Sequence, residues 1–580
     1  MATPTSNTPL AYSPLTISGV PQANMLIDGL QWANNSGLPA TTISYSFVAP
    51  GSSFFTGYDN YDSTMTAGIQ QLNGTQQAAF KSALQSWANV ANLNFVASAD
   101  NASTVGDIRV GFSTAYNWGV SNANGLTIQD YALSTPPSAL PDNGDIWLNP
   151  GSTDAYYNDS LSKLYNSPSG SSSMPQGGYE YFTLLHELGH ALGLKHPFET
   201  SALNPVVANP DNTASSSWDA KLFTVMSYTP VAGTQMVGFT FNPTTPMLLD
   251  IAAMQALYGA NTGYNAGDTV YRFNDNAGQY YFQTLWDGGG HNTIDYSGNT
   301  AANIDLRAGD GSVVGNPVYA YDANSPSNTV QVKNLWIAYG THIDAAIADG
   351  SGNNVLTANN DGDTLTGGSG NDTFYGGTGN DVFTGGGGHN VMIGNGGLDT
   401  AVYAGFRASY QLQQQAGASL PTYTLSNAAA GIMDTLTGIS RLQFADTSVA
   451  LDLNGNAGTV AKVLGAVFGP ASVANAAFVG IGLKYLDGNL MNEGGLTELA
   501  LNARLGAGFT NTAEVNLLYQ NLVGALPDAN TLAYWNSALT ANLYTQGTLA
   551  LMAVELPLNA SNIHLSGQLS VQGLPYIPMG

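Results

Sequence analysis

Short segments in which apolar and polar residues alternate recur through the first part of the chain. Ile43, Tyr45 and Phe47 have polar neighbours, a pattern typical of a half-buried strand. The same period of two recurs over residues 108–112, and residues 146–148 form a further short apolar segment. These segments predict the strands of a mixed α/β domain that takes up roughly the first 260 residues.

Two other segments of this part follow the helical period. Phe80, Leu84, Trp87 and Ala91 are spaced three or four residues apart, which predicts one long amphipathic helix. A second helix is predicted over residues 179–192, and it carries the residues best suited to chemistry.

From near Gly267 the chain changes to short strands separated by glycine turns, and a nine-residue repeat runs without insertion from Asp349 to Val402. Most repeats begin with glycines and carry an acidic residue that is followed, two positions later, by an apolar one. This pattern predicts stacked parallel strands. The apolar residues predicted to point into the stack are Leu356, Leu365, Phe374, Phe383 and Met392.

Composition narrows the class of partner. Lys and Arg number 13 against 39 acidic residues, and the net charge of −26 would repel a phosphate backbone or an anionic membrane. Nucleic-acid binding is therefore excluded, and a cation, with calcium first, is the expected partner of acids in glycine-rich sequence. The absence of cysteine rules out disulfides and thiolate metal ligands.

The sequence L-H-E-L-G-H-A-L-G-L-K-H-P, residues 185–197, is the most informative stretch. Residues four apart on a helix project from one face, so His186 and His190 can bind one Zn²⁺. Glu187 neighbours the first ligand, where its carboxylate can reach a water molecule on the metal without binding the metal. We therefore predict a zinc site, with another divalent metal as the alternative.

A glycine explains how a third ligand arrives. Gly193 can adopt the left-handed conformation that ends a helix, and Pro197 prevents helical continuation, so His196 can return to the metal from outside the helix. The alternative is a helix with ordinary buried or surface histidines. Only seven histidines occur in the chain, and three of them lie at this spacing, which favours the metal site.

The segment F-T-V-M-S-Y, residues 223–228, matches the methionine turn of the metzincins. In that turn Met226 would lie as an apolar floor beneath the three imidazoles. Tyr228 has a phenol that can bind zinc or donate a hydrogen bond to an oxyanion. A methionine alone is more often a core residue, but the preceding zinc motif favours the active-site interpretation.

Two further stretches, L-L-D-I-A-A-M-Q-A-L-Y-G-A-N and W-D-G-G-G-H-N-T-I-D-Y-S-G, complete the pattern. With them, residues of about 25 to 450 resemble the serralysins, a family of metzincin zinc proteases with calcium-binding repeats. The resemblance implies an extracellular endopeptidase in which a zinc-activated water attacks the peptide bond and Glu187 shuttles the proton. Zinc and Tyr228 would stabilise the oxyanion. The substrate is expected to lie along an edge strand, predicted at residues 144–149.

The predicted fold is therefore multidomain. It comprises an N-terminal tail or propeptide over 1–24, an α+β metzincin zinc-protease domain over 25–262, a β-roll or β-sandwich with parallel calcium nonapeptide repeats over 263–450, and a mostly α-helical C-terminal domain over 451–580.

In the nonapeptide, glycine turns present carbonyls to a cation and the aspartate adds a carboxylate. Carboxylates stacked in register would repel each other, so structural Ca²⁺ is favoured over an ion-free glycine array. Asn354 and Asn390 replace the aspartate in two repeats. The predicted calcium ligands of the repeats are Asp363, Gly368, Gly370, Asp372, Gly377, Gly379, Asp381, Gly386, Gly388 and Asp399.

The resemblance implies further calcium ligands ahead of the repeats, at Asp287, Asp295 and Asp344, with Thr269 as a neighbour. Where the family has a second aspartate in the Trp-Asp motif, this chain has Asn292.

No secretory signal is visible at the N-terminus, and no stretch approaches the roughly 18 apolar residues of a membrane span. The resemblance implies secretion from a Gram-negative bacterium by the type I route. Its implied partners are protein or peptide substrates and a proteinaceous inhibitor. The last seven residues, L-P-Y-I-P-M-G, depart from the usual serralysin terminus.

Helical patterns return after about Asp452. This part resembles a helical domain of uncharacterised function found in bacterial calcium-repeat and surface-layer proteins, and typical serralysins lack it. Attachment to a cell surface or surface layer is one hypothesis, and a helical bundle with Tyr519 and Trp535 in its core is the alternative.

Three functions are thus open: an active endopeptidase, a surface protein with a vestigial protease domain, and a zinc hydrolase that acts on something other than peptides. The presence of Glu187 together with all three histidines favours the first.

Overall fold

The structure is a computed structural model of the 580-residue chain. Most of the predicted tail, residues 1–8 and 12–19, lies outside its described residues. The described residues are 9–11, 20–34, 39–55, 58, 64–121, 127–129, 132–138, 142–150, 173–204, 206, 217–234, 236–322, 325–415, 417 and 420–579.

The chain divides into two compact units. Unit 1 comprises residues 1–298 and 302–343, and unit 2 comprises residues 299–301 and 344–580. The four-part division predicted from the sequence, with boundaries at 24, 262 and 450, stays a prediction.

A twisted sheet forms the framework of unit 1, with strand order β5-β3-β6-β10-β9 and β4 beside β6. The first four strands of that order run parallel, and β9 is antiparallel to β10. The strands are β3 (Thr41–Phe47), β4 (Ile69–Gln70), β5 (Leu93–Ala97), β6 (Ile108–Ser113), β9 (Ala132–Ser134) and β10 (Ile146–Leu148).

Two expectations for this sheet are wrong. The strand β10 does not lie at the edge, because it pairs with β6 on one side and β9 on the other, so residues 144–149 cannot offer a free edge to a peptide. Nor is β3 half-buried, because Ser44 and Ser46 are buried and their hydroxyls bond the carboxylates of Asp107 and Asp100. The polar positions of its alternating pattern face these carboxylates, not solvent.

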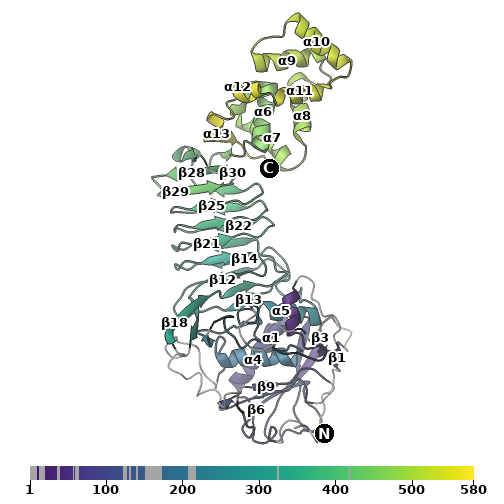
Figure 1. Cartoon of the computed structure of the whole chain (residues 1–580), viewed down its shortest axis with the longest axis vertical. Helices are drawn as coiled ribbons and strands as arrows, with labels where there is room; N and C mark the ends of the chain where they lie inside the picture. The colour runs from purple at the N-terminus through teal and green to yellow at the C-terminus, as the bar shows by residue number, and fades with distance from the viewer. Residues whose placement is uncertain are drawn as a thin grey trace. The chain divides into compact units, whose positions relative to one another are not determined.

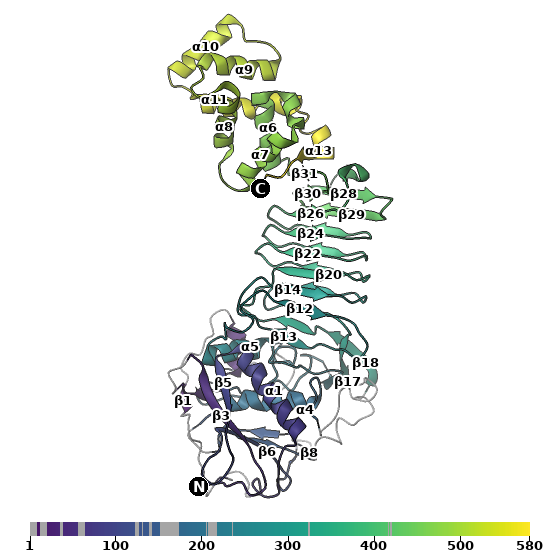
Figure 2. The ribbon, with the colours of Figure 1, turned by 180° about the vertical axis from the view of Figure 1, so that it is seen from behind.

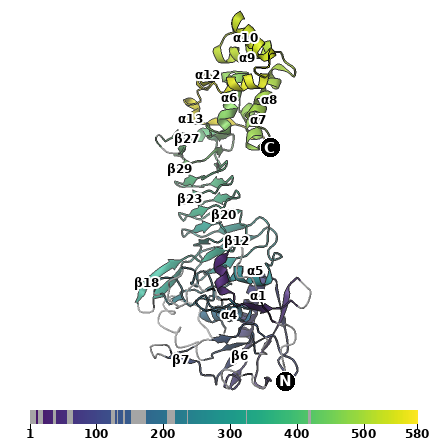
Figure 3. The same ribbon diagram turned by 45° about the vertical axis from the view of Figure 1, so that its right-hand side comes forward.

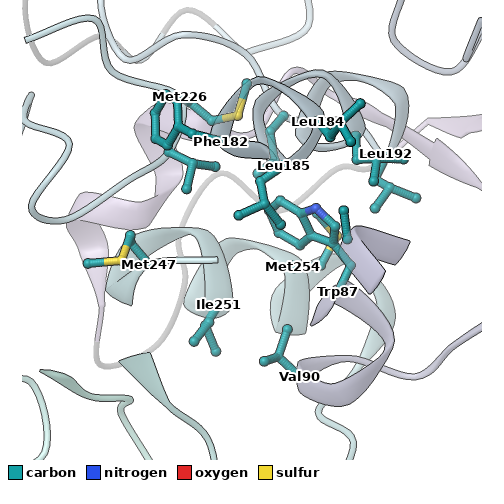
Figure 4. Packing of buried hydrophobic residues seen from close by; sticks show 14 of the residues in the cluster. Trp87, Val90, Phe182, Leu184, Leu185, Leu192, Met226, Met247, Ile251 and Met254 are labelled. Atoms are coloured by element: carbon teal, nitrogen blue, oxygen red, sulfur yellow. The ribbon is translucent and has the colours of Figure 1, made fainter. Parts of the chain in front are cut away.

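Helices α1 (Gly74–Val90), α4 (Tyr179–Ala191) and α5 (Leu248–Tyr258) pack in the core of unit 1. Both predicted helices are confirmed. Asn73 and Gln76 form a capping box that starts α1, each side chain bonding the other's backbone N–H. Figure 4 shows Trp87 of α1, Leu185 of α4 and Met254 of α5 converging in one buried cluster.

The remaining elements of unit 1 are short. They are β1 (Pro9–Ala11), β2 (Leu30–Trp32), β7 (Gly119–Ser121), β8 (Thr127–Gln129), β11 (Gly238–Phe239), β12 (Val270–Phe273), β13 (Gln283–Leu285), β14 (Thr293–Tyr296), β15 (Asn303–Asp305), β16 (Gly311–Ser312), β17 (Val318–Asp322), β18 (Ser325–Val332), β19 (Leu335–Ile337) and the 3-10 helix η1 (Pro21–Leu26).

Unit 2 begins with two facing ladders of short strands, which confirm the predicted repeat region. One ladder follows the order β20-β22-β24-β26-β30-β31-β32, and the other β21-β23-β25-β29-β28-β27. Successive rungs of the two ladders are visible in Figures 1 and 2. The five apolar residues predicted to point inward are fully buried between them: Leu356, Leu365, Phe374, Phe383 and Met392.

Strands that lie two nine-residue repeats apart in the sequence pair in parallel, as β21 does with β23 and β22 with β24. The strands of unit 2 are β20 (Ala345–Ala348), β21 (Val355–Thr357), β22 (Thr364–Thr366), β23 (Thr373–Tyr375), β24 (Val382–Thr384), β25 (Val391–Ile393), β26 (Thr400–Val402), β27 (Gln411–Gln414), β28 (Thr422–Asn427), β29 (Ile432–Thr437), β30 (Arg441–Gln443), β31 (Ser448–Ala450) and β32 (Leu574–Tyr576).

A helical part follows the ladders in unit 2, as the sequence predicted, and Figure 3 shows α6 and α7 nearer the last strands than α9 and α10. Its terminal strand β32 returns to pair with β31, and Arg441 of β30 bonds Asp487 of α7. The helices are α6 (Asn456–Phe468), α7 (Ala476–Asp487), α8 (Glu493–Leu505), α9 (Asn511–Val523), α10 (Ala529–Thr540), α11 (Gln546–Val554), α12 (Pro557–Asn562) and α13 (Gln568–Gln572), with the 3-10 helices η2 (Arg407–Ser409) and η3 (Pro470–Ala474).

Within the described ranges, every helix is either too short or too polar to cross a membrane.

Candidate metal centres

Three histidines converge at the C-terminal end of α4. His186 and His190 lie one turn apart on the helix, and His196 follows it. The Nε2 atom of His196 lies 3.1 Å from Nε2 of His186 and 3.1 Å from Nε2 of His190. The structure therefore brings together the three residues that the sequence placed at one site. In the part of the chain that is described, no other group of three metal-binding side chains is this close.

The hydrogen bonds of the Nδ1 atoms of His186 and His190 show which ring nitrogen of each imidazole carries the proton. Nδ1 of His186 lies 2.7 Å from the carbonyl oxygen of Val225, and Nδ1 of His190 lies 2.9 Å from that of Leu194. A carbonyl oxygen can only accept a hydrogen bond, so each Nδ1 carries the proton and each Nε2 presents a bare lone pair.

These residues fit a zinc ion. Lone pairs that point at one another repel unless a cation lies between them, and three nitrogens at about 2.0–2.1 Å from Zn²⁺ would be about 3.3 Å apart. Burial, and then the neighbouring histidines, hold the pKa of His186 well below its ordinary value. Burial also lowers the pKa of His190 to about 3. Both imidazoles are therefore neutral near pH 7, the form that binds metal.

The turn after α4 is built as predicted. Gly193 has a φ of +108°, and a Cβ there would lie 2.4 Å from the carbonyl oxygen of Leu30. Only glycine fits both conditions. Lys195 then secures the returning chain, because its buried ammonium donates to the carbonyl oxygens of Met25, Glu199 and Val206.

Glu199 was missed from the sequence. Its Oε1 lies 2.8 Å from Nδ1 of His196, so a carboxylate oxygen faces the third histidine where carbonyl oxygens accept from the other two. Such a carboxylate orients the ring and strengthens its basicity at Nε2. Its spacing of three residues from His196 was the available signal.

The methionine turn lies beneath α4. Met226 is fully buried, and its Sδ would be 2.5 Å from a Cβ at position 189, so Gly189 allows the sulfur to approach the helix between the two histidines. Asp250 of α5 fixes this turn, accepting from Thr224 Oγ1 at 2.6 Å and from Val225 N at 2.7 Å. Because Val225 also accepts from His186, Asp250 holds the peptide that orients a metal ligand. Sequence reasoning missed both Gly189 and Asp250.

The two predicted catalytic side chains differ in exposure. Glu187 is buried on α4 next to His186, whereas Tyr228 is 51% exposed. The ring centroid of Tyr228 lies 4.6 Å from that of His196 and 5.8 Å from that of His186. The structure thus brings Tyr228 beside the histidines, while its role and that of Glu187 stay predictions.

The acidic positions of the repeats form ladders of hydrogen bonds in unit 2. Oδ1 of Asp381 accepts from the backbone N–H of Asp363, and Oδ1 of Asp399 from that of Asp381, each bond spanning 18 residues. On the other side Asn390 accepts from Asp372 in the same way. An asparagine therefore preserves the ladder bond, although it lacks the charge of the aspartate.

The aspartates differ in the hydrogen-bond partner of their second carboxylate oxygen, Oδ2. Oδ2 of Asp372 and of Asp381 accepts from a backbone N–H four residues earlier. Oδ2 of Asp399 is buried and has no hydrogen-bond partner among the described residues. Burial is the main cause that raises the pKa of Asp399, and of Asp363, to about 7. An orphaned carboxylate oxygen among such groups fits Ca²⁺, a cation that binds oxygen ligands.

The predicted repeat glycines lie where backbones meet. A Cβ on any of the six would come within at most 2.3 Å of a backbone atom about two repeats earlier, so the stack requires glycine at these positions: Gly368, Gly370, Gly377, Gly379, Gly386 and Gly388. Their role as calcium ligands stays a prediction.

The ligands predicted ahead of the repeats lie in varied surroundings. Asp287 is buried and accepts from Tyr271 Oη and from Gly289 N. Asp295 faces Arg272, with 3.5 Å between the charged atoms.

Asn292 accepts from Thr269 N and donates to the carbonyl oxygen of His342, so it cross-links the backbone where the family has an aspartate. In unit 2 the carbonyl of Asp344 accepts from Thr364 N. The calcium roles of Asp287, Asp295 and Asp344 stay predictions.

Two family models match the chain. A matrixin peptidase model covers residues 61–221, which include the three histidines, and a model of the RTX calcium-binding nonapeptide repeat covers residues 346–374 and 366–401.

Whole-protein relatives agree with these models. The chain is 33% identical to a serralysin of Photorhabdus laumondii over 307 residues, 50% of this chain and 55% of that protein. It is 32% identical to the metalloprotease AprA of Pseudomonas entomophila, over 58% of this chain and 63% of the relative. It is 31% identical to the metallopeptidase AprA of Pseudomonas marginalis, over 60% of this chain and 67% of the relative. The match thus spans a little over half of the length of the Photorhabdus protein.

Proposed function

The chain belongs to the serralysin family of metallopeptidases, and from this premise we propose that it is an extracellular zinc endopeptidase acting on proteins. The observation that carries the proposal is the convergence of the three histidine Nε2 atoms at one point, next to an intact Glu187. A vestigial protease domain would have no need of all four residues, and the spacing of His186, His190 and His196 suits one metal ion.

His186, His190 and His196 would hold zinc, which would supply a Lewis acid able to polarise a peptide carbonyl and to lower the pKa of water towards about 7. Glu187, directly after the first ligand on α4, accepts the proton of the attacking water. It then donates this proton to the amine that leaves when the C–N bond breaks. Its burial keeps the carboxylate out of bulk water, which strengthens its pull on that proton.

The phenol of Tyr228 donates a hydrogen bond to the oxyanion that develops on the scissile carbonyl. Its exposure and its position beside His196 support this role, because the group must meet substrate at the metal.

We place the substrate on β9, not on β10. Among the described strands β9 ends the sheet order, and it packs against α4, which carries the histidines. An edge strand offers backbone N–H and C=O groups to an extended peptide, and this mode of recognition depends little on substrate sequence.

Type I secretion, and surface attachment through helices α6–α13, are further proposals. Calcium repeats support the first, because calcium modules with weak sites load only where calcium is abundant, outside the cell. Immunodetection of the chain in culture medium, in a surface wash and in cells, with and without the type I exporter, would separate these fates.

Casein digestion by the full chain tests the activity. We expect digestion that a chelator abolishes and stoichiometric zinc restores, and that Glu187→Ala abolishes without loss of zinc. Wild-type protein with bound zinc and intact fold that leaves casein and a peptide library uncut would overturn the proposal.

A further inference from the structure

Among the described residues of unit 1, one buried ammonium has no anionic partner. Lys221 lies five residues before Met226 and is only 5% exposed. Its Nζ lies 5.0 Å from the ring centroid of Phe182 and 5.5 Å from that of Tyr179. Among the residues that the structure describes, this Nζ makes no hydrogen bond and no ion pair.

Lys195, a second buried lysine of the same unit, shows what a satisfied ammonium looks like. It is 3% exposed and donates to three carbonyl oxygens. Among the described residues, Lys221 instead contacts the faces of two aromatic rings. A cation–π contact recovers part of the hydration that an ammonium loses on burial, but it provides no acceptor for the three N–H groups. The site therefore favours an anionic acceptor from another molecule.

The position of Lys221 indicates which molecule supplies this anionic acceptor. Tyr179, Phe182 and His186 are spaced by three and four residues, so they line one face of α4. The ring of Phe182 lies 6.4 Å from that of His186. A single aromatic ring thus separates the ammonium from the first metal-binding histidine. A group bound by Lys221 would belong to a substrate residue close to the scissile bond.

We propose that Lys221 is a specificity-determining residue that binds the carboxylate of a substrate residue flanking the scissile bond. The ammonium, which lies beside the rings of Phe182 and Tyr179, donates charge-assisted hydrogen bonds to that carboxylate. A lysine or arginine at the same substrate position is rejected by like charge. This inference rests on the proposed endopeptidase function and adds a substrate class to it.

The carboxylate has two sources in a peptide: an acidic side chain, or the free terminus of a chain that ends next to the cleaved bond. Both present the same two oxygens to the ammonium. Peptides with Glu at either flanking position and an amidated end report the first source, and peptides with Ala at those positions and a free terminal carboxylate report the second.

The test is a set of fluorogenic peptides that differ only at the two positions flanking the scissile bond, with Glu, Gln, Lys or Leu at each. We expect wild-type protein to have a kcat/KM at least about 10-fold higher for Glu than for Gln at one of these positions. Lys221→Met should reduce this ratio to about 1, and Lys221→Glu should favour Lys over Glu there. Lys81 also lies over an aromatic ring, that of Phe47, so Lys81→Met is the matched control and should keep the wild-type ratio.

A second measurement guards against misfolded variants. In a Glu187→Ala background, calorimetry should show that the Glu peptide binds at least about 10-fold more weakly when Lys221 is Met, while zinc content and melting temperature match the parent. If Lys221→Met lowers cleavage of the Glu, Gln and Leu peptides equally, or if wild type shows no Glu preference, Lys221 is structural and the inference is wrong. If wild type cleaves none of the peptides although it binds them with this preference, the proposed peptidase function fails and the inference stands.

Discussion

The metal centre of unit 1 and the repeat ladders of unit 2 are both built to hold cations, but they are assembled in opposite ways. The metal centre draws on α4, the turn after it, the methionine turn and Asp250 of α5, segments that share no periodicity. The ladders repeat one kind of hydrogen bond, in which a backbone N–H donates to a side chain 18 residues later.

The difference determines how each site tolerates change. In the ladders asparagine replaces aspartate at Asn354 and Asn390. Asn390 keeps the ladder bond by accepting from the backbone N–H of Asp372, and the side chain of Asn354 donates to Oδ1 of Asp372. Each repeat adds only one large buried apolar side chain, so no single rung decides stability. At the metal centre a different oxygen faces the Nδ1 atom of each histidine, and no second group of three such ligands lies as close among the described residues.

Removal of calcium should have the largest effect. Without cations the buried aspartates repel or must take up protons, and we expect residues of about 349 to 402 to lose their amide protection first. Unit 1 has its own helices and core and should keep protection in α1 and α4. Hydrogen exchange over a calcium titration of the Glu187→Ala protein avoids self-digestion. Full protection of the repeats in strong chelator would contradict the claim that calcium folds them.

Glu187→Ala should lower kcat/KM for peptide hydrolysis by at least about 100-fold, because the proton shuttle is lost. Zinc content, from metal analysis, should be unchanged, since the histidines and their acceptors remain. Activity near that of wild type would remove Glu187 from the mechanism.

Glu199→Gln should weaken zinc binding about 10- to 100-fold, because the amide no longer supports the charge on the His196 ring. Competition with a chromogenic chelator measures the zinc Kd. The matched control is Glu498→Gln on the surface of α8, which should leave the Kd unchanged. Equal zinc affinity of Glu199→Gln and wild type would show that the contact with His196 has no effect on the metal.

Tyr228→Phe should lower kcat about 10-fold and change KM by less than about 2-fold, if the phenol acts mainly in the transition state. The control Tyr375→Phe changes an exposed phenol of the repeats and should alter neither constant. A kcat equal to that of wild type would place Tyr228 outside the catalytic site.

The smallest effect concerns Glu514 of α9. Its side chain is buried, both carboxylate oxygens have no hydrogen-bond partner among the described residues, and burial raises its pKa to about 8. The folded state therefore binds more protons than the unfolded chain between the ordinary pKa near 4.5 and about 8, so stability falls as pH rises through this window.

Glu514→Leu should thus raise the free energy of unfolding of the helical part by about 1–3 kcal/mol at pH 8, and by less than about 1 kcal/mol at pH 5. Local hydrogen exchange of α9 in the full chain measures both values, with Glu498→Leu as the exposed control. An equal gain at both pH values would mean that the charge of Glu514 is not the cause.

The sequence by itself determined whatever is local or periodic. The spacing of His186, His190 and His196 predicted the metal centre, because a helix and one glycine turn suffice to bring them together. The nine-residue period predicted the strands and the buried face of the repeats, because a period of nine allows one stacking of the apolar residues. The helices around Trp87 and Leu185 followed from their apolar spacing in the same way.

Only the tertiary structure decided which distant groups meet. Gly189 leaves room for the sulfur of Met226, and Asp250 fixes the methionine turn from another helix, contacts for which no spacing gives a signal. The order of strands placed β9, not β10, at the edge, because pairing in a sheet depends on the path of the chain between strands. Lysine side chains are usually exposed, and only the packing of its segment on α4 buries that of Lys221, without an anionic partner among the described residues.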